Sequence, residues 1–104
     1  MDREKRTRLQ AAGWKVGSAA DFLGLSPEDA LLVDIRARLA SALSTRRAKQ
    51  QMTQAELARR IHSSQSRVAK MEAADGSVSL DLLIRSLLAL GATRKDLATA
   101  IAGK

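Results

Sequence analysis

The sequence predicts an all-α protein, and three observations support that prediction. Apolar residues make up 45% of the 104 residues but aromatic residues only 2%, so the expected core is aliphatic and rich in alanine, which favours helices over strands. Several segments begin with Ser or Thr and continue with apolar residues three or four positions apart, the spacing of one helix face. Turn residues, including glycine, separate these segments. We therefore expect one helical domain at residues 27–104, preceded by an arm at residues 1–26.

The arm combines a charged start with a short helix. Residues 1–12 mix charges with a single Leu, which predicts disorder or order that depends on a partner. Trp14, the only Trp, either anchors the arm to the helical body or forms a contact hot spot for a partner. Ser18 and Asp21 form a capping box for one or two helical turns, which Gly24 would end.

A long amphipathic helix is predicted to follow the arm. Ser26 can cap it and Pro27 suits its first position, with acidic residues in the first turn. The helix is predicted to run to about Lys49, and four residues repeat every four positions to give it an apolar stripe: Leu31, Ile35, Leu39 and Leu43. The arginines near the end of this helix suit either its C-terminal dipole or a phosphate, and the sequence does not separate the two.

Residues 53–72 predict two short helices joined by a sharp turn. Thr53 and Glu56 form a capping box, and Leu57 and Ile61 lie one turn apart on one face of the first helix. The two residues that follow are too few for anything but a tight bend between packed helices.

The second of these helices is predicted to have one apolar and one polar face. Ser64 offers its N-cap, and Val68 and Met71 lie three residues apart on the apolar face. The outer face carries four side chains that form hydrogen bonds or carry positive charge: Gln65, Ser66, Arg67 and Lys70. Side chains of these types are what reading the major groove of DNA requires.

Two more helices are predicted after this pair. Residues 73–76 turn the chain, and Ser79 caps a helix whose apolar face ends before Gly91. Thr93 and Asp96 form another capping box, and the last helix has one apolar side.

A dimer contact is predicted in this C-terminal part of the chain. Leu82 and Leu90 look surplus to the core of a single chain, so they, or the last helix, are the expected contacts. The alternative is that these leucines simply cover the long helix.

Residues 53–72 resemble the helix-turn-helix of the XRE, or lambda-repressor-like, family. The features that match are a Gln opening the first helix, Leu-Ala within it, a Ser-Gln-Ser run opening the second helix and two apolar residues later in it: Gln54, Leu57-Ala58, Ser64-Gln65-Ser66, Val68 and Met71. The resemblance covers roughly residues 31–101. It departs at His62, where the family usually has Gly, and a left-handed conformation there costs His more than it costs Gly.

The resemblance implies a lambda-repressor-like five-helix DNA-binding domain that reads the major groove of double-stranded DNA with the helix at residues 65–73. Family members usually bind as dimers to near-palindromic operators. We therefore expect a homodimeric transcriptional repressor in the bacterial cytoplasm, associated with the nucleoid. The short arm before the domain also resembles HigA-type antitoxins, and in that subtype the partner is a small protein toxin.

The resemblance also implies roles for individual residues. Gln65 is expected to read an adenine edge, and Ser66, Arg67 and Lys70 to contact base edges or the groove wall. Gln54 matches a phosphate contact of the family. Further expected phosphate contacts are Arg46, Arg47, Arg59 and Ser64. The alternative for Gln65 and Ser66 is a solvated start of a helix.

Positive charge is concentrated around the predicted motif. The chain has a net charge of +7, and between Arg46 and Lys70 seven Lys and Arg residues stand against a single acid, Glu56. Such clustering predicts a polyanionic partner, because each neutralised phosphate releases counterions. The alternative is an ordinary solvated surface, but the coincidence with the motif favours a nucleic acid.

Residue types needed for catalysis are scarce. His62 is the only His and no Cys is present, so a disulfide or a usual zinc site is excluded. We expect neither an enzyme nor a bound cofactor, because no glycine-rich phosphate loop or nucleophile elbow occurs. His62 either shapes the turn or contacts a phosphate, and we favour the turn. No apolar run approaches the roughly 20 residues of a membrane span, and the lack of Cys fits a reducing cytoplasm.

Two other functions stay open at this point. The first is a protein-interaction module in which Trp14, Phe22 and the rest of the arm bind a protein partner, with DNA binding secondary. The second is a nonspecific nucleic-acid binder. Against it stand the uncharged Gln65 and Ser66 and the scarcity of aromatic residues for base stacking.

Overall fold

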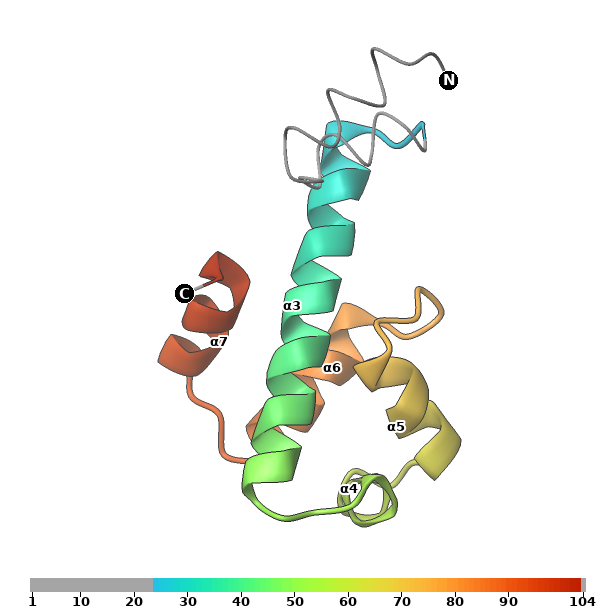
Figure 1. Ribbon diagram of the computed structural model, residues 1–104, viewed down its shortest axis with the longest axis vertical. Coiled ribbons are helices and arrows are strands. Elements are labelled where there is room, and N and C mark those ends of the chain that lie inside the picture. Colours follow the sequence, from blue (N-terminus) through green and yellow to red (C-terminus); the bar gives the residue numbers. More distant parts are fainter. Residues whose placement is uncertain (1–23, 104) are drawn as a thin grey trace, which may run out of the picture. The chain divides into compact units, whose positions relative to one another are not determined.

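The computed structural model describes residues 24–103, and all regular structure in that range is helical (Figure 1). No strand occurs among these residues, and the helices are α3 (Pro27–Lys49), α4 (Gln54–Arg60), α5 (Gln65–Glu72), α6 (Leu80–Ala89) and α7 (Arg94–Ala102). The predicted all-α class and its five-helix form are therefore confirmed. The roles predicted for Trp14, Phe22 and the Ser18–Asp21 cap lie outside the described residues.

The chain divides into two compact units, Met1–Ile35 and Arg36–Lys104, and each is described by itself. In the first unit, α3 begins as predicted: Ser26 Oγ accepts a hydrogen bond from the backbone N–H of Asp29 at 3.1 Å. The predicted helix is present and ends at Lys49, but its apolar residues differ in burial: Leu31 is 58% exposed, whereas Leu39 is fully buried. Spacing puts residues on one face of a helix, but burial also requires an element packed against that face.

The core of the second unit is aliphatic and draws on four of its helices. Its fully buried large side chains come from α3 to α6: Leu39, Leu43, Leu57, Val68, Met71, Leu83 and Leu87. Burying one such side chain stabilises the fold by about 1.5–3 kcal/mol. Ser86 is the buried polar residue among them, and its Oγ donates to the carbonyl of Leu82 at 2.8 Å, so its burial leaves no polar atom unsatisfied.

The dimer contact predicted for Leu90 is wrong, because this side chain is only 3% exposed within a single chain. Leu90 caps the C-terminus of α6, and the left-handed Gly91 that follows turns the chain back. The backbone N–H of Ala92 then bonds the carbonyl of Leu87 at 3.0 Å, which closes a Schellman motif and keeps Leu90 against the core. The dimer contact predicted for Leu82, which is half-buried, stays a prediction.

The predicted helix starts are confirmed from α4 onward. Ser64 and Ser79 each accept a hydrogen bond from a backbone N–H three residues later, at 3.2 and 3.1 Å. Thr53 and Thr93 do the same, and the acids three residues after them reach back to complete two capping boxes. Each cap satisfies backbone donors that would otherwise lack partners.

Helices α3, α4 and α5 end in the same Schellman motif as α6, but without glycine. The left-handed residues are Gln51, His62 and Ala74, with φ angles of 56°, 57° and 58°. At the end of α4, the backbone N–H groups of His62 and Ser63 bond the carbonyls of Arg59 and Ala58 at 3.3 and 2.8 Å. His62 thus adopts the conformation for which the family usually has Gly, and these two bonds offset part of the cost.

In the view of Figure 1, α4 and α5 lie on one side of the second half of α3 and α7 lies on the other. The C-terminal end of α3 is bonded both to the end of α6 and to α7. Gln50 Nε2 donates to the carbonyl of Leu90 at 2.7 Å, and Arg46 pairs with Asp96 of α7 at 3.1 Å. None of the residues of α7 is buried, so this helix depends on ties of this kind.

Candidate nucleic-acid interface

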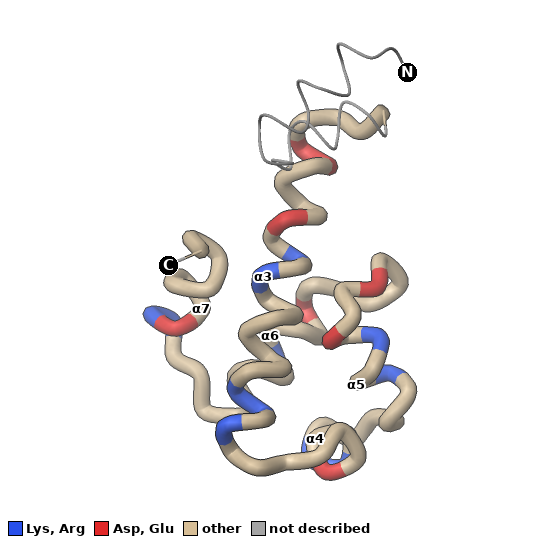
Figure 2. The backbone as a smooth tube through the Cα atoms, viewed as in Figure 1, with Lys and Arg blue, Asp and Glu red and all other residues tan. Residues whose placement is uncertain are grey.

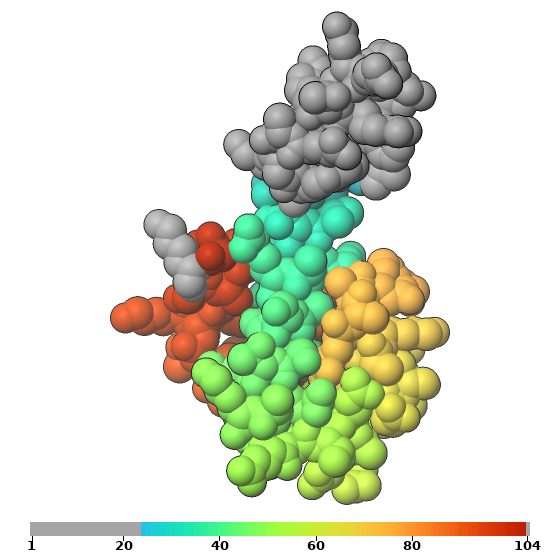
Figure 3. Space-filling view, in the orientation of Figure 1, coloured from blue at the N-terminus to red at the C-terminus, as the bar shows by residue number. Residues whose placement is uncertain are grey.

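Helix α5 has one face in the core and one face in solvent. Val68 and Met71 are fully buried, which fixes how the helix is rotated about its axis. All four predicted base contacts are exposed: Gln65, Ser66, Arg67 and Lys70. Helices α4 and α5 together form a continuous part of the surface, and Lys and Arg residues lie along α5 and the last turns of α3 (Figures 2 and 3).

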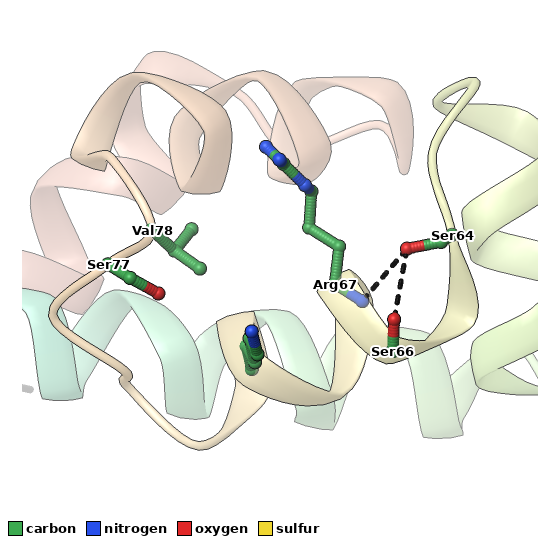
Figure 4. A pocket seen from close by; sticks show the side chains of 6 residues that line it. Ser64, Ser66, Arg67, Ser77 and Val78 are labelled. Atoms are coloured by element: carbon green, nitrogen blue, oxygen red, sulfur yellow. Dashed lines mark hydrogen bonds between the residues drawn. The ribbon is translucent and has the colours of Figure 1, made fainter.

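A polar hollow of about 180 Å³ lies beside the start of α5 (Figure 4). Its walls carry three hydroxyls and two cationic side chains, from Ser64, Ser66, Arg67, Lys70 and Ser77, together with Val78. Ser64 Oγ lies 3.2 Å from Ser66 Oγ and accepts the N–H of Arg67, whose side chain extends away from the helix in Figure 4. Hydroxyls and cations converging on one hollow suit a phosphate group.

The far wall of this hollow is the loop between α5 and α6, and it is fixed by two contacts. Arg36 of α3 donates to the carbonyl of Val78, and Asp75 Oδ1 accepts the N–H of Ser77 at 2.8 Å. The hydrogen bonds from Ser77 hold the pKa of Asp75 below its ordinary value, and the charges of Lys70 and Arg36 act in the same direction. Lys70 therefore lies within the field of a carboxylate, which offsets part of its charge.

The first residues of α4 and α5 are joined by their side chains. Gln65 Nε2 donates to Gln54 Oε1 at 2.8 Å, and Gln54 Nε2 donates to Oε1 of Glu72 at 3.1 Å. The structure thus brings together two of the predicted DNA contacts, Gln54 and Gln65. Their bond holds the start of α5 at a defined place relative to the start of α4.

Glu72, at the end of α5, in turn binds Arg47 of α3. Arg47 donates from Nε to Glu72 Oε2 at 2.6 Å, from Nη2 to Glu72 Oε1 at 3.0 Å, and from Nη1 to the carbonyl of Met52 at 2.7 Å. The two side chains are only 18% and 8% exposed. Such a bidentate Arg–carboxylate pair is strong and directional. Together with the bond to Met52, it means that all three nitrogens of the Arg47 guanidinium donate to partners within the protein.

Burial opposes ionisation of Glu72, yet its pKa lies below the ordinary value. The hydrogen bonds from Arg47 and Gln54, the charge of Arg47 and a hydrogen bond from Ser44 together outweigh the cost of desolvation. Glu72 is therefore a carboxylate at neutral pH. Arg47 neutralises its charge, which would otherwise repel an anion bound near the start of α5.

The other predicted phosphate contacts are distributed unevenly. Ser64 lies at the start of α5 and borders the hollow, and Arg59 is exposed in the last turn of α4. Arg46 is 29% exposed and paired with Asp96, outside the pair formed by α4 and α5. Arg46 and Arg47 are thus neighbours in sequence but pair with different helices, α7 and α5.

The bonds of Glu72 and the loop that forms the far wall of the hollow were not predicted from the sequence. A signal for Glu72 was present, because it follows Gln65 by seven residues, or about two turns, and so lies near the same stripe of α5. Its partner Arg47 lies 25 residues earlier in the chain, and that pairing has no local signal. Arg36 and Val78 are 42 residues apart and could not be paired from the sequence for the same reason.

Within residues 24–103, no group of three His, Cys, Asp or Glu side chains is placed to hold a metal ion. None of the helices in that range combines the length and the apolar character needed to cross a membrane.

A sequence profile of one family matches residues 43–97, more than half of the chain, and its description is helix-turn-helix. The match includes α4, α5 and α6 in full, with the end of α3 and the start of α7. No curated protein and no solved structure matches the chain significantly.

Proposed function

Because this chain belongs to the helix-turn-helix family, of the XRE type, we propose that it is a transcriptional repressor that reads a DNA sequence as a homodimer. One observation carries the sequence-reading part of the proposal. The two residues that open α5 are exposed and uncharged, Gln65 and Ser66, on a helix whose opposite face is fixed in the core. Uncharged hydrogen-bonding groups add little to nonspecific electrostatic attraction, and at the exposed leading end of a helix they can distinguish base edges.

In this proposal α5 enters the major groove with its first turn foremost. Gln65 reads an adenine, and Ser66 and Lys70 contact neighbouring base edges. Arg67 either forks onto a guanine or binds a phosphate in the hollow that it borders. A phosphate in that hollow is supported by the hydroxyls of Ser64 and Ser77 beside the guanidinium of Arg67, since Ser66 and Lys70 are assigned to base edges.

Phosphate contacts set the register of the protein on the duplex. We assign these to Ser64, to Arg59 and to the second N–H of the Gln54 amide, whose first N–H is used by Glu72. The bonds of Arg47 to Glu72 and of Arg46 to Asp96 support an internal role for both arginines, so we rank them below the other phosphate contacts.

The proposed dimer contact is α7, with Ile101 as its centre. Two observations support this choice: α7 buries none of its residues in a single chain, and Ile101 is 41% exposed. Analytical ultracentrifugation of Ile101→Glu tests it, because a charge at the contact should convert a dimer into a monomer. A toxin partner is supported by resemblance alone, so the proposal does not include it.

Selection from a randomised duplex pool at two salt concentrations, followed by sequencing, tests the function. A repressor dimer should enrich a two-fold-related motif with half-sites about one helical turn (~34 Å) apart. That motif should survive about 150 mM salt, whereas uniform binding that vanishes with salt would leave only the electrostatic contribution and refute the proposal.

Two variants distinguish sequence-specific base contacts from nonspecific electrostatic attraction to DNA. Gln65→Ala should cost about 1–3 kcal/mol of binding free energy on the selected site and relax the preference at one base pair. Arg59→Ala should weaken binding to selected and random duplexes alike. Equal losses on both duplexes for Gln65→Ala would remove it from the base contacts.

A further inference from the structure

Four side chains form a continuous series of hydrogen bonds from α3 to the exposed start of α5. Arg47 binds Glu72 at 2.6 and 3.0 Å, Glu72 accepts from Gln54 at 3.1 Å, and Gln54 accepts from Gln65 at 2.8 Å. The series begins in a largely buried ion pair and ends on an exposed amide that we propose reads a base.

The direction of every bond in this series follows from the chemistry of Glu72. An ionised carboxylate accepts hydrogen bonds and donates none. Gln54 must therefore turn its amide nitrogen toward Glu72, which leaves its Oε1 on the other side. Because that oxygen only accepts, Gln65 must turn its own nitrogen toward Gln54.

Glu72 is held in the ionised form that this argument requires. The guanidinium of Arg47 binds both of its oxygens, and its pKa lies below the ordinary value despite burial. A protonated Glu72 would place a donor in the series and remove the constraint on Gln54. The carboxylate of Glu72 therefore does more than join α5 to α3 through Arg47, because as an acceptor it also sets the polarity of the amides of Gln54 and Gln65.

The amide of Gln65 then has one arrangement left for a ligand. Its Oε1 accepts no hydrogen bond from residues 24–103, and one of the two N–H groups on its Nε2 is unused, so the amide presents one acceptor beside one donor. The major-groove edge of adenine offers the matching pair, the N6 donor and the N7 acceptor. Guanine offers two acceptors, O6 and N7, and matches an amide that turns its NH₂ group outward.

We propose that Glu72 is a specificity-determining residue that makes Gln65 prefer adenine over guanine without touching the DNA itself. This inference rests on the proposed function, because it assumes that Gln65 reads a base. It makes base choice depend on a residue at the opposite end of α5, through the intermediate amide of Gln54.

The substitution Glu72→Gln tests the inference, because an amide fills the same space but can either donate or accept. With that freedom, Gln54 and Gln65 can both reverse. The measurement is the ratio of dissociation constants for two duplexes that carry adenine or guanine at the base pair where Gln65→Ala relaxes selection. The wild-type ratio should be on the order of tenfold or more, and it should fall to about threefold or less in Glu72→Gln.

The matched control is Arg47→Gln, which breaks the same ion pair but keeps the carboxylate of Glu72. Both variants lose stability, so thermal unfolding should show similar losses, and binding is compared well below the lower midpoint. Arg47→Gln should keep the wild-type adenine-to-guanine ratio. A folded Glu72→Gln protein with the wild-type ratio, or equal loss of the ratio in both variants, would overturn the inference.

A second variant covers the case in which Glu72→Gln does not fold. Gln54→Met interrupts the series and leaves the Arg47–Glu72 pair in place, so the ratio should fall as in Glu72→Gln, while general affinity falls because a phosphate contact is lost. A preserved ratio in folded Gln54→Met would also count against the inference.

The series of hydrogen bonds can also be tested without DNA. Such a test shows whether the series is absent independently of whether the proposed function is correct. In NMR spectra, the side-chain amide protons of Gln54 and Gln65 should exchange slowly in the wild type and faster in Glu72→Gln. If the wild type selects no sequence, the proposed function fails and base choice by Glu72 fails with it. If it selects a sequence but these amides exchange as freely as in a solvated Gln, the series alone is refuted.

Discussion

Helices α4 and α7 begin in the same way and are held in different ways. Each starts with a Thr whose acid partner, three residues later, completes a capping box. Helix α4 buries Leu57 and Ala58 and is joined to α5 through Gln54. Helix α7 has no fully buried residue and is bonded to α3 by the partly exposed Arg46–Asp96 pair. Caps thus decide where a helix begins, and burial decides how firmly it is held.

The largest expected difference between the two helices is in the core. Leu57→Ala should destabilise the protein by about 2–5 kcal/mol, because it empties a fully buried site. Leu97→Ala in α7 should cost at most about 1.5 kcal/mol, because its side chain is only half-buried. Urea unfolding followed by far-UV circular dichroism measures both. Similar losses would mean that α7 is held as firmly as α4.

The ion pairs bonded to the two helices should differ next, because Gln54 of α4 bonds the Arg47–Glu72 pair and Asp96 of α7 is itself paired with Arg46. Arg47→Ala leaves the largely buried carboxylate of Glu72 without its charge partner and should cost about 2–3 kcal/mol, somewhat less than for a fully enclosed pair. Arg46→Ala breaks a partly exposed pair and should cost under about 1 kcal/mol. The same unfolding experiment at low and high salt checks the distinction, since only the Arg46 effect should shrink markedly with salt.

The two caps should contribute similar free energies of stabilisation, but removing each should affect a different part of the structure. Thr53→Ala and Thr93→Ala should each cost about 1 kcal/mol. The first loss should appear in global unfolding. The second should appear mainly as local opening of α7, measured as faster amide hydrogen exchange within residues 94–102. A change in exchange that spreads through the whole protein after Thr93→Ala would contradict the comparison.

The smallest expected effect is on pH dependence. The backbone hydrogen bonds from Thr53 and Thr93 hold the pKa values of Glu56 and Asp96 below their ordinary values. A carboxyl whose pKa is lowered by folding contributes stability that is fully present above its unfolded-state pKa, about 4, and is lost as pH falls through the lower folded-state value.

Stability should therefore be level above about pH 5 and fall below about pH 4, and Glu56→Gln should reduce that acid-dependent part. Titration of the two carboxyl groups by NMR checks both directions. A pKa of Glu56 that does not rise in Thr53→Ala would show that the cap is not the cause.

The sequence predicted the helix starts and the exposed face of α5 well, because both depend on residues a few positions apart. Each Ser or Thr cap acts on a backbone group three residues later, so a short window contains the whole interaction. The burial of individual apolar residues was not predicted well, because it depends on packing. Leu31 continues the spacing of Leu39 and is exposed, whereas Leu90 looked surplus and is buried.

The candidate site shows the same division. The exposure of Gln65, Ser66, Arg67 and Lys70 follows from the spacing of the buried Val68 and Met71. The bonds of Glu72 to Arg47 and Gln54 join residues 25 and 18 positions apart, and a sequence contains no record of which distant side chains will meet. The same bonds give Arg47 a partner that the sequence did not predict, and its phosphate contact stays a prediction.

The adjacency of Arg46 and Arg47 restricts how the length of this chain can vary during evolution. Two neighbouring side chains leave a helix about 100° apart, and here one reaches α7 while the other reaches α5. Inserting or deleting one residue between Leu43 and Arg46 would rotate both by about 100° and shift both by about 1.5 Å relative to the core leucines of α3. Both partners would be lost at once, so related sequences should vary in length before α3 or in its loops, but not in this turn.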